Sequence, residues 1–187
     1  MDRNYGRGSF LIANPVLPDP NFSRTVVLLC NHDEQGSFGL VVNRPAELDA
    51  TEILESINFP CSTEYGLYIG GPVSPSQMFY LYRSSKAVLG TDRVCDDIYV
   101  GMRLDMLTEV VESLEDPKRD IRFYVGYSGW GAGQLEGEME RKSWLTCDAT
   151  SEFVFHDDES RIWSGAVKSL GEEYAYLVNA PINPQWN

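Results

Sequence analysis

Short apolar runs with the composition of β-strands recur along this sequence, and segments rich in glycine and proline separate several of them. Residues 25–30 and 121–125, for example, consist mostly of β-branched, aromatic and other apolar residues, which favour strands. Segments with helical periodicity occur between such runs at irregular intervals. A doubly wound parallel sheet needs a regular alternation of strands and helices, so the sequence predicts an α+β fold instead.

The apolar runs predict strands or short extended segments along most of the chain. Residues 31–37 are polar, contain Gly36 and separate two of these runs, which predicts a β-hairpin. Glycines and prolines between residues 70 and 75 predict a turn between two later strands. The predicted strands are residues 10–13, 25–30, 38–42, 66–69, 78–82, 98–100, 121–125, 144–147, 153–155 and 174–178.

Apolar residues at helical spacing predict helices at residues 48–57, 104–114 and 162–170. The second is amphipathic, with its leucines and valines on one face and its acidic residues off that face. A shorter helix is predicted to carry Leu135 and Met139. Gly171 is expected to end the last helix in the left-handed conformation.

The composition limits the classes of partner that suit this chain. With 187 residues, of which 43% are apolar, residues 1–187 are expected to form a single domain around one core. The chain has 15 lysines and arginines against 28 aspartates and glutamates, a formal net charge of -13. This charge repels phosphate backbones, so direct binding to nucleic acids is not expected without a concentrated cationic patch.

The cysteines and the apolar runs indicate a cellular compartment. The four cysteines, Cys30, Cys61, Cys95 and Cys147, lie far apart, unlike the framework of a secreted disulfide-rich domain. No apolar run resembles a signal peptide or reaches membrane-spanning length. We therefore expect a cytoplasmic protein with reduced thiols and no membrane association.

The glycine-rich segment at residues 126–133 invites comparison with two catalytic or binding motifs. It follows a predicted strand, but Glu136 occupies the third glycine position of a dinucleotide-binding fingerprint and would oppose a phosphate. Ser128 resembles a nucleophile elbow, but Trp130 stands where that motif needs a glycine. We therefore predict no catalytic residue in this segment, and interpret it as a tight turn packed by Tyr127 and Trp130.

Cys30 is a candidate reactive thiol, because Cys30 and His32 would share one face of an extended strand. Cys30 also ends a strongly apolar run, so the alternative is a buried, inert thiol. The two histidines are far apart and the cysteines form no Cys-x-x-Cys pair. The sequence thus predicts no metal site and no cofactor.

Several of these segments together resemble the YqgE/AlgH family. The resemblance covers nearly the whole chain in the order of the family. The matching blocks are residues 8–15, 24–30, 39–45, 70–73 and 126–136, followed by Glu138, Trp144 and Leu145. A departure is Tyr82, at the end of a predicted strand where the family often has histidine.

The resemblance implies more about fold than about activity. It implies an α+β fold in which a bifurcated, mostly antiparallel sheet is folded into a pseudo-barrel with a few flanking helices. The family is largely uncharacterised, and the label of transcriptional regulator comes from the alginate-regulation name of one branch. Because the chain is strongly acidic, such a role would be indirect.

The family motifs suggest one set of residues as a ligand or partner surface: Arg24, Asn43, Arg44, Tyr127, Trp130 and Gln134. The rival interpretation of the polar members is a buried network that holds the split of the sheet.

Two functions follow from these interpretations. The first is a non-catalytic regulatory or protein-interaction role with an unidentified protein partner. The alternative is a binder of a small anionic ligand, or an enzyme, in which Arg24 and Arg44 hold the anion beside Tyr127 and Trp130.

Overall fold

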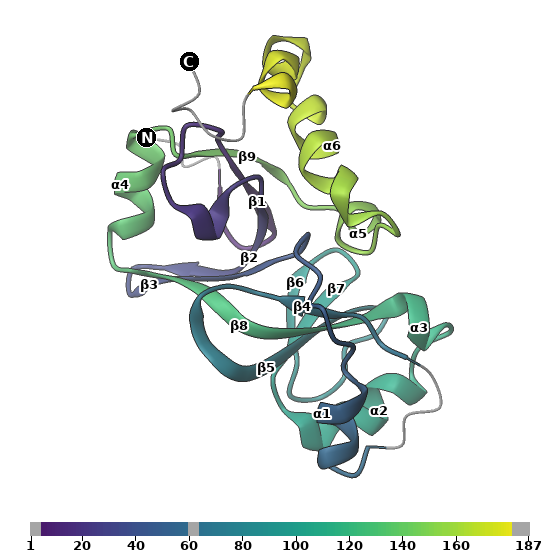
Figure 1. Ribbon diagram of the computed structural model, residues 1–187. Coiled ribbons are helices and arrows are strands. Elements are labelled where there is room, and N and C mark those ends of the chain that lie inside the picture. The colour runs from purple at the N-terminus through teal and green to yellow at the C-terminus, as the bar shows by residue number, and fades with distance from the viewer. Residues whose placement is uncertain (1–4, 60–63, 181–187) are drawn as a thin grey trace.

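The computed structural model describes residues 5–59 and 64–180, so Cys61 lies outside the described part of the chain (Figure 1). Nine strands in these residues form one sheet, in the order β6-β7-β5-β8-β3-β2-β1-β9, with β4 pairing to β8 off this path. The strands are β1 (Ser9–Ala13), β2 (Val26–Asp33), β3 (Gly36–Val41), β4 (Leu67–Ile69), β5 (Val73–Arg83), β6 (Asp92–Cys95), β7 (Ile98–Gly101), β8 (Ile121–Gly131) and β9 (Trp144–Asp148). All pairs are antiparallel except β4 with β8.

The long strand β8 is where the sheet splits. One edge of β8 pairs with β5, and the other edge pairs first with β4 at residues 123–125 and then with β3 at residues 128–131. Gly126 lies between these two partners with φ 68°, and a Cβ there would lie 2.4 Å from the carbonyl oxygen of Gly71. A backbone turn of this kind requires glycine, so Gly126 allows β8 to change partners.

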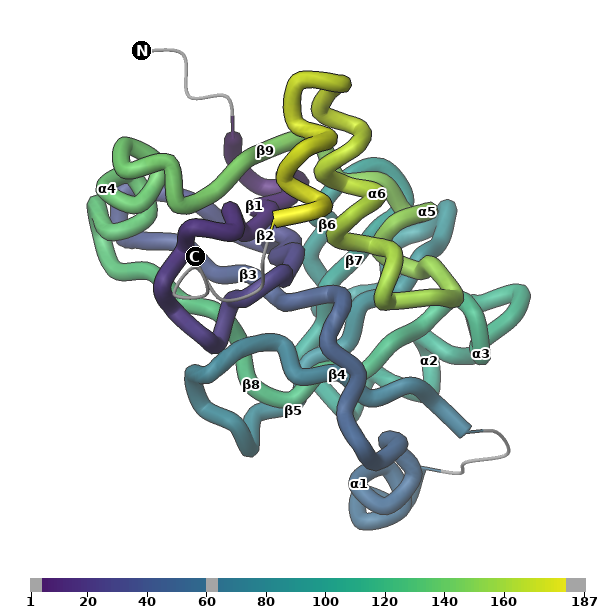
Figure 2. Tube along the Cα trace, turned by 45° about the horizontal axis from the view of Figure 1, so that its top comes forward, coloured from purple at the N-terminus to yellow at the C-terminus, as the bar shows by residue number. Residues whose placement is uncertain are grey.

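The sheet curls into a half-barrel, as Figure 1 shows, and the helices cover its ends. Helix α6 packs beside β1 and β2 (Figure 2), and its Ile162 and Val167 are buried with Val26 and Leu28. The helices are α1 (Thr51–Ser56), α2 (Leu107–Glu112), α3 (Pro117–Asp120), α4 (Gln134–Glu140), α5 (Ser151–Val154) and α6 (Ile162–Ser169). Short 3₁₀ helices are η1 (Pro20–Phe22), η2 (Leu104–Met106), η3 (Glu159–Arg161) and η4 (Glu172–Asn179). The predicted α+β fold with a bifurcated antiparallel sheet is confirmed.

Many of the predicted elements form, with different bounds. The predicted hairpin is β2 with β3, and the amphipathic helix at residues 104–114 is split into η2 and the shorter α2. The tight turn predicted at residues 126–133 is wrong for residues 126–131, which continue β8. The turn predicted to extend to Pro75 ends earlier, because β5 begins at Val73 and accommodates the proline in an irregular register.

Two strand predictions near the C-terminus are wrong. Residues 153–154 belong to α5, whose first turn is capped by the Thr150 hydroxyl accepting from the Phe153 N–H, and Phe155 is the residue that ends this helix. Residues 174–178 lie in η4, where Tyr174, Leu177 and Val178 pack against the core at helical spacing. Gly171 follows α6 with φ 128° and ψ 165°, outside the predicted left-handed helical region.

Candidate functional site

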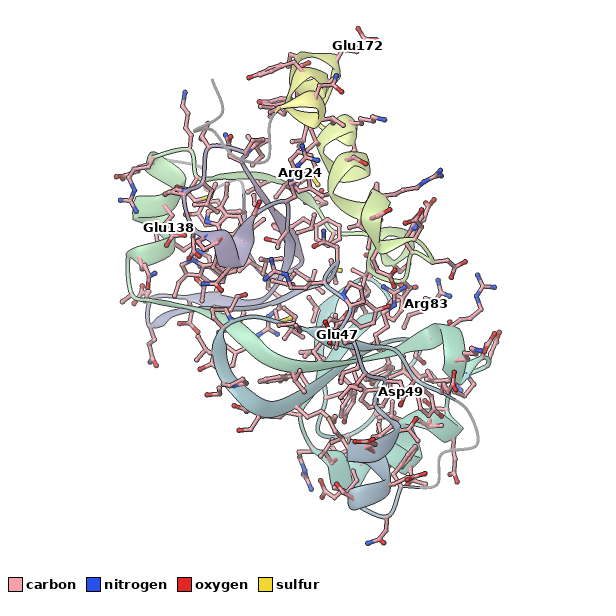
Figure 3. The ribbon with its side chains drawn as sticks, in the orientation of Figure 1. Arg24, Glu47, Asp49, Arg83, Glu138 and Glu172 are labelled. Carbon is pink, nitrogen blue, oxygen red and sulfur yellow. The ribbon has the colours of Figure 1, made fainter. Side chains whose placement is uncertain are left out.

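The strongest candidate site is a pocket of about 340 Å³ between residues 17–22 and α4. Two of the residues predicted from the sequence, Trp130 and Gln134, line it, and Glu138 and Trp144 line it with them. These residues come from the end of β8, from α4 and from the start of β9. Figure 3 shows Glu138 on α4, beside the N-terminal segment that carries η1.

The carboxylate of Glu138 is held by three neutral donors. Its Oε2 accepts hydrogen bonds from the indole Nε1–H groups of Trp130 at 2.9 Å and Trp144 at 2.7 Å. Its Oε1 accepts from the Gln134 side-chain amide at 3.2 Å, across one turn of α4. Among the described residues, no lysine or arginine nitrogen forms an ion pair with this carboxylate. Within the described part of the chain, the pocket therefore contains an oriented carboxylate that has no cationic partner.

Aromatic side chains form the wall behind this carboxylate. Phe22 stacks on Trp130 with ring centroids 6.2 Å apart, and meets Trp144 edge-on at 5.3 Å. Trp130 and Trp144 meet edge-on at 6.0 Å. Both tryptophans are buried, as is typical of large aromatic residues that supply core packing. Their mutual packing fixes the two indole N–H groups that hold Glu138.

Two of the predicted polar residues, Asn43 and Arg44, hold the segment that carries Phe22. The Asn43 amide donates to the carbonyl of Arg24 at 2.9 Å and accepts from the N–H of Val26 at 2.8 Å. Arg44 donates to the carbonyl of Asn21 at 2.7 Å. These bonds tie residues 43–44, which follow β3, to residues 21–26. The polar residues thus form a partly exposed network that holds this segment, and they do not hold the split in the sheet.

The guanidinium group of Arg24 points toward the C-terminal helices (Figure 3). It donates to the carbonyl of Ala180 at 2.7 Å and lies 5.0 Å from the ring centroid of Trp163. Trp163 in turn donates its indole N–H to the carbonyl of Ala13. Arg24 and Arg44 thus bind backbone carbonyls in different places, and the structure does not bring them together around an opening.

Tyr127 lies apart from the pocket. Residues 127 and 130 are three apart in β8, so their side chains leave opposite faces of the sheet. Tyr127 packs against Phe38 at 5.5 Å and Phe79 at 5.8 Å between ring centroids, whereas Trp130 packs against Phe22 and Trp144. The six predicted residues therefore divide into two that line the pocket, three that hold backbone segments, and Tyr127.

The environment of Cys30 favours the inert interpretation. Its side chain is 2% exposed, its Sγ donates to the carbonyl of Leu28, and burial raises the pKa of the thiol well above its ordinary value. The β2–β3 register shifts between Leu29 and Asn31, so the regular alternation that predicted a shared face for Cys30 and His32 is broken. His32 bonds to Ser37 instead, at 2.7 Å between Nδ1 and Oγ.

The surroundings of His32 favour the tautomer that cannot act as a base toward Ser37. The Nε2 of His32 is buried and has no hydrogen-bond partner among the described residues. A proton on Nε2 would lose its hydration without replacement, so the neutral ring is expected to carry its proton on Nδ1. Nδ1 then donates to Ser37, and His32 has no lone pair there to accept the hydroxyl proton.

Tyr82 has a structural role in this chain. Its hydroxyl accepts from the N–H of Val88 at 3.0 Å and bonds to the Thr91 hydroxyl at 2.8 Å, while its ring stacks on Tyr99. These contacts hold the segment between β5 and β6. The family's histidine position is thus filled by a residue that fixes a loop.

Sequence reasoning named Glu138 as a motif position but did not propose it as a site residue. The available signal was the spacing of Gln134 and Glu138 on one face of a short helix between two tryptophan-bearing strands.

Within residues 5–59 and 64–180 there is no group of three or more histidines, cysteines, aspartates or glutamates placed to hold a metal ion. In the same residues, no helix has both the length and the apolar composition needed to cross a bilayer.

The fold and site describe a class of α+β protein in which a half-barrel sheet divides at one long strand and an acidic, aromatic pocket lies near the end of that strand. The sequence profile of AlgH-like proteins matches residues 10–175, and the chain belongs to this family.

Relatives of known sequence and structure match nearly the full length. A UPF0301 protein of Chlorobium limicola is 39% identical over 180 residues, covering 96% of this chain and 95% of the relative. One from Cytophaga hutchinsonii is 36% identical, covering 97% and 98%. The solution structure of the AlgH protein from Pseudomonas aeruginosa is similar with a TM-score of 0.75 and 32% identity, covering 97% of each chain. Protein DIP2367 from Corynebacterium diphtheriae, at 21% identity, covers 95% of this chain and 94% of its own, and shares the fold with a TM-score of 0.79.

Proposed function

We propose that this protein acts without catalysis, as a regulatory or interaction protein, and that the pocket between residues 17–22 and α4 binds a segment of a partner protein. The observation that supports this most is the Glu138 carboxylate, held in place by two buried indoles in the wall of an open pocket. Binding hot spots are typically preformed pockets with aromatic walls and a few fixed polar groups.

The rim of the pocket suits a peptide. Leu17, Pro18 and Pro72 contribute apolar surface at the rim, and Pro18 and Pro72 are exposed. Asn43 and Arg44 hold the segment that forms one wall, so the shape of the pocket exists before a partner arrives. A preformed site loses less conformational entropy on binding than one that must be ordered.

The two alternatives have less support. An anion held by Arg24 and Arg44 would have to compete with the backbone carbonyls that both side chains already contact. Direct DNA binding would have to overcome a net charge of -13, and Arg83, Arg103, Arg119 and Arg161 each pair with an aspartate. A transcriptional role would therefore act through a protein partner, and we propose that it does so in the cytoplasm.

The test is affinity capture from a native extract with a pocket-filling variant. Pro18→Trp places an indole at the rim, and Thr108→Trp places the same side chain on the exposed surface of α2 as a matched control. We expect wild type and Thr108→Trp to retain the same protein, and Pro18→Trp to retain at least about tenfold less, with both variants folded by circular dichroism. Equal retention by the two variants, or turnover of a small molecule with no protein retained, would contradict the proposal.

A further inference from the structure

We infer that the pocket accepts one positively charged side chain, a lysine or an arginine, of the partner protein. This inference rests on the proposed function, and it specifies the chemistry that the pocket recognises. It follows from the hydrogen-bond capacity of Glu138, from the aromatic wall and from the charges around the rim.

Glu138 has capacity left for one further donor. An ionised carboxylate offers about four acceptor positions. Trp130, Trp144 and Gln134 occupy three of them through neutral N–H groups, which orient the carboxylate without cancelling its charge. A fourth donor that carries a positive charge would complete the set and neutralise the site. A carboxylate or phosphate at this position would instead be repelled by the Glu138 carboxylate.

The other pocket residues favour a cation with an apolar stem. Phe22 and the two indoles present aromatic surface, against which the methylene groups of lysine or arginine pack and to which their charged ends are attracted. Asp19, on the wall opposite α4, is a second carboxylate in the pocket, and its Oδ1 also accepts from the N–H of Asn21. A volume of about 340 Å³ accommodates one such side chain together with part of its backbone.

The net charge of the molecule acts in the same direction, whereas Arg141 in the pocket lining acts against it. The net charge of -13 attracts a basic partner at long range. Arg141 is exposed on the rim of the pocket and opposes a cation there. Replacing Arg141 should therefore strengthen binding of a cation, whereas removing the charge of Glu138 should weaken it.

The experiment is an NMR titration of the ¹⁵N-labelled protein with Nα-acetyl-arginine amide and Nα-acetyl-lysine amide. Nα-acetyl-citrulline amide serves as the neutral isostere of the arginine probe. The indole N–H signals of Trp130 and Trp144 report on the pocket, and that of Trp163, which is bonded to the Ala13 carbonyl, is the internal reference. We expect a cationic amide to shift the first two signals saturably and leave the reference unchanged, with citrulline amide at least about tenfold weaker.

Variants separate charge from shape. Glu138→Gln keeps a carbonyl that can accept from both indoles and removes the charge, so we expect at least about tenfold weaker binding of the cationic amide. Glu140→Gln, at an exposed position of the same helix, is the matched control and should bind as the wild type does. Arg141→Gln should bind about twofold to threefold more tightly. If Glu138→Gln does not fold, the comparison with citrulline amide on the wild type still decides.

Equal binding of arginine and citrulline amides, unchanged binding by a folded Glu138→Gln, or no shift of either indole signal with any probe would overturn the inference. If Pro18→Trp nevertheless loses the captured protein, the pocket remains a partner site and only the cationic chemistry fails. If Pro18→Trp retains that protein as well, the proposed function fails too.

Discussion

Asn43 connects two parts of the chain through both ends of its side-chain amide, to Arg24 and to Val26. Asn43→Ala leaves a partly buried carbonyl and a buried N–H without these partners, so we expect a loss of about 1–3 kcal/mol in the free energy of unfolding. Urea denaturation measures the change. Gln77→Ala, at an exposed position of β5, should cost less than about 0.5 kcal/mol. Equal midpoints for the two variants would show that the amide does not hold this segment.

At the scale of residues, the sequence identified positions better than roles. Arg24, Asn43 and Arg44 were recognisable as polar residues within the family motifs, but their hydrogen bonds join residues that are distant along the chain. Such partners depend on how the sheet brings segments together, which a motif does not encode. The choice between a reactive and an inert Cys30 also depends on the folded structure, because burial and the irregular register in β2 determine the environment of its thiol.

Gly126 is predicted to be indispensable for the element that divides the sheet. Gly126→Ala forces a side chain into a backbone with φ 68° and places its Cβ 2.4 Å from the Gly71 carbonyl oxygen. We expect a loss of about 2 kcal/mol or more in the free energy of unfolding, measured by thermal or urea denaturation. Gly131→Ala, at the end of the same strand, has no atom within 4 Å of its added Cβ and is the control. Equal stability of the two variants would contradict this account of the split.

At the scale of elements, apolar periodicity predicted the strands of the sheet more reliably than the C-terminal helices. Strands β1, β2, β3 and β9 are continuous apolar or alternating runs, so their pattern survives in isolation. Residues 153–155 and 174–178 have similar composition but are helical or end a helix, because a Thr150 cap and packing against the core decide their backbone. Strand β6 is not predicted from the sequence, because its alternation of polar and apolar residues is short and includes the charged Asp92 and Arg93.

The whole molecule is expected to lose stability as the pH rises above about 9. Burial raises the pKa of Cys95 from 9.0 to about 11 and that of Tyr80 from 10.0 to about 12, and it raises the pKa of Cys30 further. Between the unfolded and folded pKa values, the unfolded chain has released protons that the native protein still binds, so the free energy of unfolding falls with increasing pH. Urea denaturation at pH values from 8 to 11 measures this slope, and a flat profile would contradict it.

At the scale of the whole molecule, the family resemblance conveyed the bifurcated sheet, and the net charge limited the classes of partner that we expect. Neither indicated that residues 17–22 would enclose a pocket with β8, α4 and β9, because residues 17–22 lie far along the chain from these three consecutive elements. The pocket exists because β8 is long enough to pair with β5 at one end and with β3 at the other. The candidate site is thus a consequence of the topology.

The most direct test of this account is photo-crosslinking from the rim of the pocket in the native cellular background. A photoreactive phenylalanine analogue at position 18 is compared with the same analogue at position 108, and the linked peptides are identified by mass spectrometry. The account predicts one partner protein linked from position 18 and absent from position 108, through a segment that contains lysine or arginine next to the linked residue. The same proteins linked from both positions, or a neutral or acidic segment linked from position 18, would contradict it.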